Sequence, residues 1–324
     1  MDSDHPSAAP GDGNRILLII TSSYDATVDF LLSFLPPGGV FRFNTDLFQQ
    51  YELWFDASGF TLTDPAGRSC SSQQTYKAYW RWPDWPVAKN AEERYAQAEA
   101  RYLVREMTNL LWLHGKFVLV EPEAPRRSGK LLQLTQAAEF FNVPPFQAGL
   151  NARYSARNGP EVVKSLSKSL PDGKFIFSTA LDPSRLAPNL PWFMQRYVEA
   201  VFDITVVVVR NRLFAFKLPR DFLASEIDWR AVTHEDDAWS PTKLSPPVTT
   251  AILRYMRAMR LDFGRLDFLM DASGELHFCE VNPNPQYAWL DYDRQCGLLS
   301  AVLDEISPTT ERHSIPVAHP LAEV

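Results

Sequence analysis

The stretch "ELHFCEVNPNPQYAWLD", residues 275–291, combines a strand-like run with an abrupt polar end. Its first half alternates as a half-buried strand does, which places Glu280 near the strand end, where side chains reach a cleft. The prolines at 283 and 285 cannot continue a central sheet, so the chain leaves the ladder there. Glu280 and Asn282 lie two residues apart in an extended chain and therefore point to the same side. Taken alone, the pattern also fits a strand end with polar punctuation.

A second strand-like run, "FGRLDFLM" at 263–270, precedes this stretch, and a turn at Asp271–Gly274 joins the two runs into a predicted hairpin. In such a hairpin Asp267 and Glu280 stand close across the ladder. With Asn282 they offer three oxygen ligands at one edge. Mg²⁺ prefers a few protein oxygens, with water and phosphate completing its octahedron. The alternative is a hydrogen-bonded acidic pair at a strand end.

Cationic side chains are expected elsewhere if a nucleotide binds beside such a metal. Lys164 ends the run "EVVK", just before a polar loop at 165–174 whose backbone N–H groups can cover phosphates. Lys130 opens a helix after "SG", and Arg230 in "IDWR" carries a planar fork that pairs with phosphate. Asp203 heads a strand and can accept hydrogen bonds from ribose hydroxyls. The alternatives are a solvated turn for the loop at 165–174, a surface lysine for Lys130, a local ion pair for Arg230 and a turn residue for Asp203.

Composition and charge exclude several classes of protein. The 324-residue chain has a net charge of -7 and a pI near 5.5, which argues against a general nucleic-acid binder, since such proteins are normally basic. No apolar run approaches the about 18 residues that cross a bilayer. Residues 1–14 lack the basic and apolar parts of a signal peptide, and the scattered cysteines indicate reduced thiols. We therefore expect a cytoplasmic protein that binds neither nucleic acid nor membrane.

The order of elements predicts several domains. A buried strand, an amphipathic helix and a second strand open the chain as an α/β unit, and helical periodicity at 91–114 precedes an expected strand "KFVLVEP" at 116–122. We expect a disordered leader at residues 1–14, an N-terminal α/β domain at 15–125 and a flexible tail at 307–324.

The order of these motifs resembles that of a known superfamily. Lys130, Lys164, "MQRYVEAVFD", "IDWR", "RLDFLM" and "CEVNPN" follow one another as in the ATP-grasp ligases, and most closely as in the graspetide (microviridin-type) peptide maturases and related peptide-glutamate ligases. The opening "ILLIITSSYDATVDFLLSFL" and the stretch "YWRWP" are similar to the N-terminal domain of the graspetide branch. The resemblance covers residues 15–305. It implies an α/β (α+β) ATP-grasp fold with an N-terminal open α/β (pre-ATP-grasp) domain. A central small α+β domain with the phosphate-covering loop would follow at residues 126–198, and a C-terminal antiparallel-sheet domain with the metal site at 199–306.

The resemblance implies a nucleotide- or metal-binding role for each matching residue. Lys130 and Lys164 would hold the α- and β-phosphates of ATP, Arg230 the γ-phosphate, and Asp203 the ribose. The hinge that carries adenine would consist of Gln195, Arg196, Tyr197 and Val198. The ligands of two Mg²⁺ ions would be Asp267, Glu280 and Asn282.

Three positions depart from the family pattern. The hinge reads Gln195-Arg196 where the family usually has Gln-Glu, Thr205 stands where relatives often have arginine, and Pro285 replaces a common glycine. The threonine removes a cation that is expected near the reacting phosphate or acyl group. Lys217 or Arg210 is the candidate substitute, and alternation alone does not settle which side of the sheet each faces.

The resemblance implies an ATP-dependent carboxylate ligase that matures a ribosomal precursor peptide with leader and core segments. The enzyme would phosphorylate Asp or Glu side chains and join them to Ser, Thr or Lys side chains as macrocyclic esters or amides. Arg230 and Lys217 would be its catalytic residues, and a homodimer or higher homo-oligomer its assembly. Two alternatives stay open: a ligase that joins a free amino acid or amine to a peptide or small-molecule carboxylate, and a degenerate module that binds nucleotide or peptide without turnover.

Overall fold

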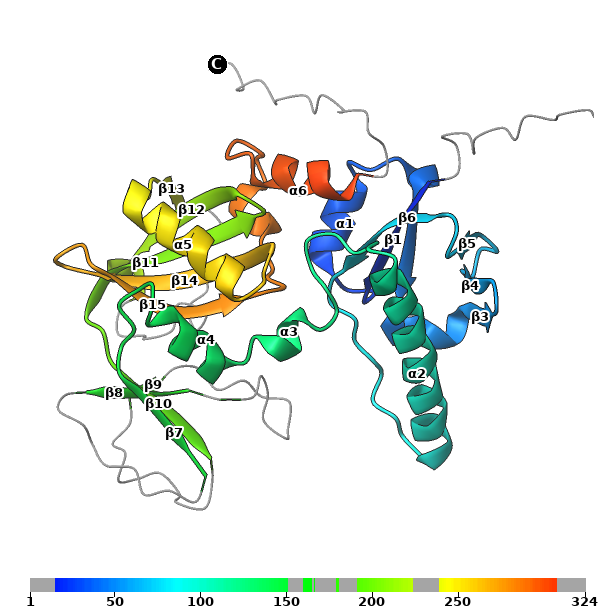
Figure 1. The fold of residues 1–324 in the computed structure, drawn as a ribbon, viewed down its shortest axis with the longest axis horizontal. Helices are drawn as coiled ribbons and strands as arrows, with labels where there is room; N and C mark the ends of the chain where they lie inside the picture. The colour runs from blue at the N-terminus through cyan, green and yellow to red at the C-terminus, as the bar shows by residue number, and fades with distance from the viewer. Residues whose placement is uncertain are drawn as a thin grey trace, which may run out of the picture. The chain divides into compact units, whose positions relative to one another are not determined.

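The computed structural model describes residues 15–150, 160–164, 166, 179–180, 191–223 and 239–307. Several segments named above lie outside the described residues: the expected leader, nearly all of the expected tail, and most of the loop at 165–174. Arg230 lies outside them as well. The chain forms two compact units, which are Met1–Ala124 with Gln286–Val324, and Pro125–Pro285 (Figure 1).

The first unit is built on a parallel sheet of three strands in the order β2-β1-β6. The central strand β1 (Ile16–Thr21) pairs with β2 (Val40–Asn44) on one side and β6 (Thr75–Trp80) on the other. Residues 17–20 are fully buried, and strands buried on both faces form continuous apolar runs instead of alternating ones. With α1 (Ala26–Leu32), this sheet gives the α/β unit that the opening sequence predicts.

A second sheet and a long helix complete the core of this unit. The strands β3 (Glu52–Asp56), β4 (Gly59–Thr63) and β5 (Ser69–Ser71) form an antiparallel sheet, with a tight turn between the first two. The helix α2 (Ala91–Leu113) buries one side only. Its buried residues share one apolar cluster with both sheets, made up of Leu18, Ile20, Phe41, Phe43, Phe60, Leu62, Cys70, Ala78, Val104, Met107 and Leu111.

The C-terminal part of the described chain returns to the first unit. The helix α6 (Leu298–Ile306) is largely buried and packs against β6. Lys77 of β6 donates hydrogen bonds from Nζ to the backbone carbonyls of Glu305 and Ser307, at 2.6 and 3.0 Å. The last carbonyls of a helix have no partner within it and carry partial negative charge, so this lysine stabilises the end of α6.

The second unit contains two antiparallel sheets. The first has the order β7-β10-β8-β9, and the second has the order β13-β12-β11-β14-β15. Their strands are β7 (Phe146–Gly149), β8 (Glu161–Lys164), β9 (Thr179–Ala180), β10 (Trp192–Arg196), β11 (Ala200–Val209), β12 (Arg212–Pro219), β13 (Ser240–Thr242), β14 (Phe263–Asp271) and β15 (Leu276–Asn282). The second unit also contains the helices α4 (Lys130–Ala137) and α5 (Pro246–Ala258) and the 3₁₀ helix Arg220–Leu223, and the short helix α3 (Ala124–Arg127) begins at its boundary in the sequence. The other 3₁₀ helices, Pro37–Gly39, Thr45–Gln50 and Ala288–Asp291, belong to the first unit. Among the described helices, none is both long and apolar enough to cross a bilayer.

The helix α5 covers one face of the five-stranded sheet (Figure 1), and an aromatic cluster fixes it there. The ring of Tyr255, on α5, has its centre 5.2 Å from that of Phe278 on β15. The ring of Phe141, which follows α4, lies 5.2 Å from Phe268 on β14 and 5.4 Å from Tyr255. Tilted aromatic pairs at such distances are favourable beyond the area that they bury. We call this side of the sheet, which carries Phe268 and Phe278, the core face.

One expected strand is not formed. Within residues 116–122 the structure has only an isolated bridge, between Phe117 and Ala78 of β6. Leu119 has a φ of 63°, a left-handed conformation that interrupts an extended chain. The prediction of a strand at 116–122 is therefore wrong. The apolar residues Val118, Leu119 and Val120 are buried without belonging to a sheet.

A buried ion pair lies at the carboxyl ends of the parallel strands in the first unit. Asp25 caps α1, because its Oδ1 accepts hydrogen bonds from the backbone N–H groups of Thr27 and Val28 at 3.1 and 3.3 Å. Its Oδ2 lies 3.4 Å from Nε of Arg81, and neither side chain is exposed. Nη2 of Arg81 also donates to Oε1 of Gln286 at 3.2 Å, which joins the chain that follows β15 to this pair.

Asp25→Ala is expected to lower the free energy of unfolding by about 3–5 kcal/mol, because it leaves a buried guanidinium without its carboxylate. Urea unfolding followed by circular dichroism measures this change. Asp29→Ala is the matched control, since it removes an exposed carboxylate from the same helix and costs about 1 kcal/mol or less. Equal losses for the two variants would contradict the role given to Asp25.

Candidate functional site

The hairpin of β14 and β15 places the three predicted oxygen ligands on one face of the sheet. In its register Asp267 lies directly opposite Glu280, and Arg265 lies opposite Asn282. Facing residues of an antiparallel ladder share a side, and so do residues two apart on a strand. The predicted cross-ladder pair of Asp267 and Glu280 is therefore present. We call the side of the five-stranded sheet that carries these residues the site face.

A one-residue bulge produces this arrangement. Asp267 pairs with Glu280, but the next residue, Phe268, pairs with Phe278, so Cys279 is the extra residue of β15. Phe278 is fully buried on the core face, while Glu280 lies on the site face. Strict alternation would have placed both on one side. The regular alternation predicted for this strand is therefore wrong at Cys279.

Two neighbours on the site face hold the carboxylate of Asp267. Thr205 lies opposite it on β11 and donates from its hydroxyl to Oδ1 at 2.7 Å. Nη2 of Arg265 lies 3.1 Å from Oδ2, and the two side chains are 12% and 22% exposed. Each carboxylate oxygen has two lone pairs, so these contacts leave acceptor capacity for a cation. Sequence reasoning missed Arg265, although a spacing of two residues on a strand places it beside Asp267.

Two predicted phosphate-binding lysines come from separate elements. Lys130, the first residue of α4, has its Nζ 3.9 Å from Oε2 of Glu280, and both side chains are partly exposed. Lys164, the last residue of β8, donates from Nζ to Oε1 of Gln195 at 3.0 Å. The structure therefore brings Lys130 to the proposed metal ligands and Lys164 to the predicted hinge.

The bulge residue Cys279 lies among charged groups from both sheets of this unit. Burial raises the pKa of its thiol to about 12, Lys164 opposes the rise, and the carboxylates of Asp267, Glu280 and Asp203 add to it. Electrostatic influence falls off with distance, so these four side chains lie near enough to act on the thiol. The thiol stays protonated at neutral pH.

Gln133 ties the helix that begins with Lys130 to the strand that carries the ligands. Its Oε1 accepts a hydrogen bond from the N–H of Val281 at 3.0 Å. That N–H is available because β15 is the edge strand of its sheet. The side-chain amide also donates to the carbonyl of Ser128, just before α4. Sequence reasoning missed Gln133, because a glutamine in a helical pattern is usually exposed and this one is buried.

The predicted adenine hinge follows β10 and has a fixed backbone. Gln195 is buried, and its amide extends from the ammonium of Lys164 to a backbone carbonyl. The N–H groups of Arg196 and Tyr197 donate to prolyl carbonyls at 2.8 and 2.9 Å. The chain is therefore anchored before it reaches Val198.

The predicted ribose ligand, Asp203, lies on β11 two residues from Thr205 and hence on the site face. Its carboxylate lies 3.4 Å from Nη1 of Arg220, in the 3₁₀ helix that follows β12, and both side chains are largely buried. Sequence reasoning gave Arg220 no role, since only the pairing of β11 with β12 brings it close. The predicted γ-phosphate ligand, Arg230, lies outside the described residues.

The structure does not bring Lys217 to the site face. It lies opposite Ile204 in the ladder of β11 and β12, and Ile204 faces Phe268 in the ladder of β11 and β14. Lys217 therefore shares the core face, on the other side of the sheet from Thr205. The other suggested substitute, Arg210, lies at the turn after β11 and pairs with the exposed Asp262, which precedes β14.

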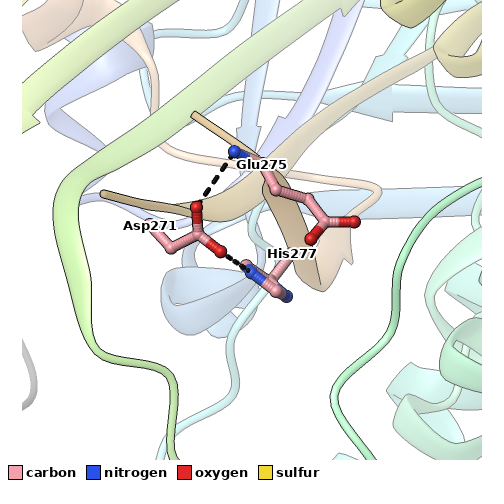
Figure 2. A group of neighbouring side chains, drawn as sticks. All are labelled: Asp271, Glu275 and His277. Atoms are coloured by element: carbon pink, nitrogen blue, oxygen red, sulfur yellow. Dashed lines mark hydrogen bonds and ion pairs between the residues drawn. The ribbon is translucent and has the colours of Figure 1, made fainter. Parts of the chain in front are cut away.

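A second group of ligand-type side chains, Asp271, Glu275 and His277, lies at the turn of the same hairpin (Figure 2). Nε2 of His277 lies 2.8 Å from Oδ2 of Asp271, and Nδ1 lies 3.1 Å from the amide nitrogen of Asn142. An amide nitrogen only donates, so Nδ1 is the acceptor and Nε2 carries the proton that Asp271 accepts. Both ring nitrogens are engaged, and the group stabilises the turn instead of offering a histidine ligand to a metal.

The chain matches no protein-family model and no curated protein sequence. It does match solved structures over nearly its whole length. A RiPP-associated ATP-grasp ligase from Chryseobacterium gregarium, in complex with ADP and a leader and core peptide, gives a TM-score of 0.74 at 20% identity, covering 90% of this chain and 96% of that one. The macrocyclase MdnC from Microcystis aeruginosa MRC, bound with precursor peptide MdnA, gives 0.74 at 18% identity, covering 90% and 98%. The ATP-grasp ligase PsnB, complexed with minimal precursor, Mg and ADP, gives 0.68 at 17% identity, covering 94% and 100%.

The chain has the ATP-grasp fold. The fold class that the sequence predicts, a mixed α/β architecture with the ATP-grasp fold, is thereby confirmed. The Asp267–Glu280 hairpin belongs to the five-stranded antiparallel sheet of this fold, and the lysines belong to α4 and β8.

Gln133→Leu is expected to lower the free energy of unfolding by about 1–3 kcal/mol, because the buried N–H of Val281 loses its acceptor. Urea unfolding measures the change. Gln136→Leu makes the same replacement on the same helix at a partly exposed side chain and should stay within about 0.5 kcal/mol of wild type. If the two variants lose the same stability, the bond to Val281 has no special role.

Hydrogen bonds from His277 and Ser273 hold the pKa of Asp271 below its ordinary value of 3.8. Because the folded-state pKa is the lower one, ionised Asp271 adds stability above the unfolded pKa, and this contribution is lost as the pH falls through the folded pKa. At about pH 5 we therefore expect wild type to have a higher unfolding free energy than Asp271→Asn, and this difference should shrink below about pH 4. Urea unfolding at several pH values tests this. The exposed Glu275 gives the control, Glu275→Gln, whose difference should change little over the same range.

Proposed function

We propose that this protein is an ATP- and Mg²⁺-dependent carboxylate ligase that matures a ribosomally made precursor peptide. It activates Asp or Glu side chains of the peptide and joins them to Ser, Thr or Lys side chains as macrocyclic esters or amides. The observation that carries the proposal is the cross-ladder pair of Asp267 and Glu280, with Asn282 on the same face and the ammonium of Lys130 3.9 Å from Glu280. The similar ligase from Chryseobacterium gregarium is complexed with ADP and a leader and core peptide, which supports the same class of substrates here.

The donor set of the site fits Mg²⁺. It consists of two carboxylates and one amide oxygen on a single face, and hard divalent cations take oxygen ligands of this kind. The neighbouring thiol of Cys279 has a pKa raised to about 12 by burial, so it stays protonated and does not favour a softer metal such as zinc. The similar structure of PsnB is complexed with Mg and ADP, which supports the choice of metal.

The remaining predicted residues supply the nucleotide contacts in this proposal. Lys130 and Lys164 bind the α- and β-phosphates, and Arg230 binds the γ-phosphate. Asp203, oriented by Arg220, accepts from the ribose hydroxyls. The anchored hinge of Gln195, Arg196, Tyr197 and Val198 carries adenine. Lys217, on the core face, is not part of the proposed catalytic group.

The proposed chemistry needs positioning and charge neutralisation more than covalent help. Bound Mg²⁺ would neutralise charge on the phosphate chain. A substrate carboxylate oxygen attacks the γ-phosphorus, ADP leaves, and an acyl phosphate results. A hydroxyl or amine of the peptide then attacks the acyl carbon and phosphate leaves, so each ring removes one water from the peptide. The lysines hold the phosphate oxygens while these bonds change, and water must be kept away from the acyl phosphate.

Glu280→Gln is expected to lower peptide-stimulated phosphate release by at least about 100-fold, because the variant loses a charged ligand of the metal. Circular dichroism should show an unchanged fold. Glu275→Gln is the control, since it makes the same replacement at the exposed turn of the same hairpin and should keep the wild-type rate. Wild-type turnover by Glu280→Gln would refute the metal role.

Mass spectrometry distinguishes the proposed reaction from its alternatives. The substrate to incubate with ATP and Mg²⁺ is any short peptide that proves to be encoded beside the gene and that carries repeated Thr or Ser and Glu or Asp residues. Loss of one water for each bond supports cross-linking. A gain equal to a free amino acid or amine minus water supports the simpler ligase, and no peptide-stimulated phosphate release would contradict both.

A further inference from the structure

Both proposed metal-binding carboxylates are paired with cations of the protein itself. Arg265 lies 3.1 Å from Asp267, and Lys130 lies 3.9 Å from Glu280. In the hairpin register Arg265 also lies opposite Asn282, so its guanidinium projects from the same face as all three proposed ligands. A guanidinium in this position repels a divalent cation and occupies one carboxylate oxygen of Asp267, a proposed ligand of that cation.

The energetic consequence depends on burial. The side chain of Arg265 is 12% exposed and that of Asp267 is 22% exposed, so water screens this pair only in part. A divalent cation that arrives alone must separate the pair and then remain close to the displaced guanidinium. A cation that arrives with a nucleotide brings phosphate oxygens, and these form charge-assisted bonds with a guanidinium fork.

We propose that Arg265 is a counter-ion that makes metal binding depend on the nucleotide. It pairs with Asp267 as long as neither metal nor nucleotide is bound, and it turns to the phosphate chain when the two bind together. The inference rests on the proposed function, since it concerns the same site. It assigns to Arg265 of β14 the cation that Thr205 cannot supply, because a threonine side chain carries no charge. The hydroxyl of Thr205 donates to Asp267 instead.

A counter-ion of this kind predicts effects of opposite sign in the two states of the site. Arg265→Gln removes the repulsion and should tighten the binding of Mn²⁺ alone by about tenfold. The same variant loses a charge-assisted bond to phosphate and should weaken the binding of Mn²⁺ with a non-hydrolysable ATP analogue by about tenfold. A purely structural role for the arginine would weaken both.

The experiment counts free Mn²⁺ by electron paramagnetic resonance, with and without the analogue, for wild type and variants of the full chain. Arg265→Lys keeps the charge and should stay within about threefold of wild type in both states. Lys217→Gln changes the net charge by the same amount from the core face of the same sheet, and it should leave the affinity for Mn²⁺ alone unchanged. Thr205→Val removes the uncharged bond to Asp267 and should not tighten that affinity.

The proposal is overturned if Arg265→Gln shifts both affinities in the same direction or leaves both unchanged, or if Lys217→Gln tightens Mn²⁺ binding equally. Should Arg265→Gln fail to fold, wild type still decides: Mn²⁺ alone must bind at least about tenfold more weakly than Mn²⁺ with the analogue, and equal affinities refute the counter-ion. A wild-type protein that binds no analogue at all refutes the proposed function instead, and the effect of Arg265→Gln on Mn²⁺ alone still tests the counter-ion.

Discussion

The candidate site depends on one extra residue in an edge strand. Without the bulge at Cys279, the side chains of Phe278 and Glu280 would lie on the same face of the sheet. One of two costs would then follow: a phenylalanine leaves the aromatic core, or a carboxylate enters it without a partner. The bulge separates the two requirements, because it sets the register of the core residues independently of that of the ligands. The positions of Glu280 and Asn282 relative to Asp267 follow from this irregularity.

A bulge at a sheet edge needs support, and α4 provides it. The edge strand β15 has no further strand of the described chain beyond it, so its outward N–H groups need other acceptors. Gln133 accepts from Val281, and the backbone carbonyl of Asn142 accepts from Phe278, which brackets the bulge on both sides. The same helix begins with Lys130. The contact that fixes the strand therefore also fixes the distance between a proposed phosphate ligand and a proposed metal ligand.

The sequence predicts the parts of this site that depend on local pattern, and it misses those that depend on tertiary pairing. Alternation and a turn signal were enough to pair Asp267 with Glu280, since both lie on one hairpin. Alternation could not place Lys217, because its face is set by pairing with β11, nor could it detect the extra residue at 279. A run of apolar residues predicted a strand at 116–122. The sequence gives no sign of the left-handed backbone at Leu119, because leucine rarely adopts that conformation. Gln133 acquires its structural role only through the sheet edge that it meets in three dimensions.

The paired charges of the site meet two demands that conflict. A site for a metal and a polyphosphate needs carboxylates and cations close together, and each would be costly if left alone in a partly buried place. Pairing Asp267 with Arg265, and Glu280 with Lys130, balances the charge of these four groups. In the proposed function, each carboxylate would exchange a protein cation for the metal, and each protein cation would exchange a carboxylate for a phosphate oxygen. The number of opposite-charge contacts would be conserved in that exchange, whereas metal or phosphate entering alone would leave one partner of each pair without compensation. The proposed arrangement would therefore favour simultaneous binding on electrostatic grounds alone, before any movement of the chain is considered.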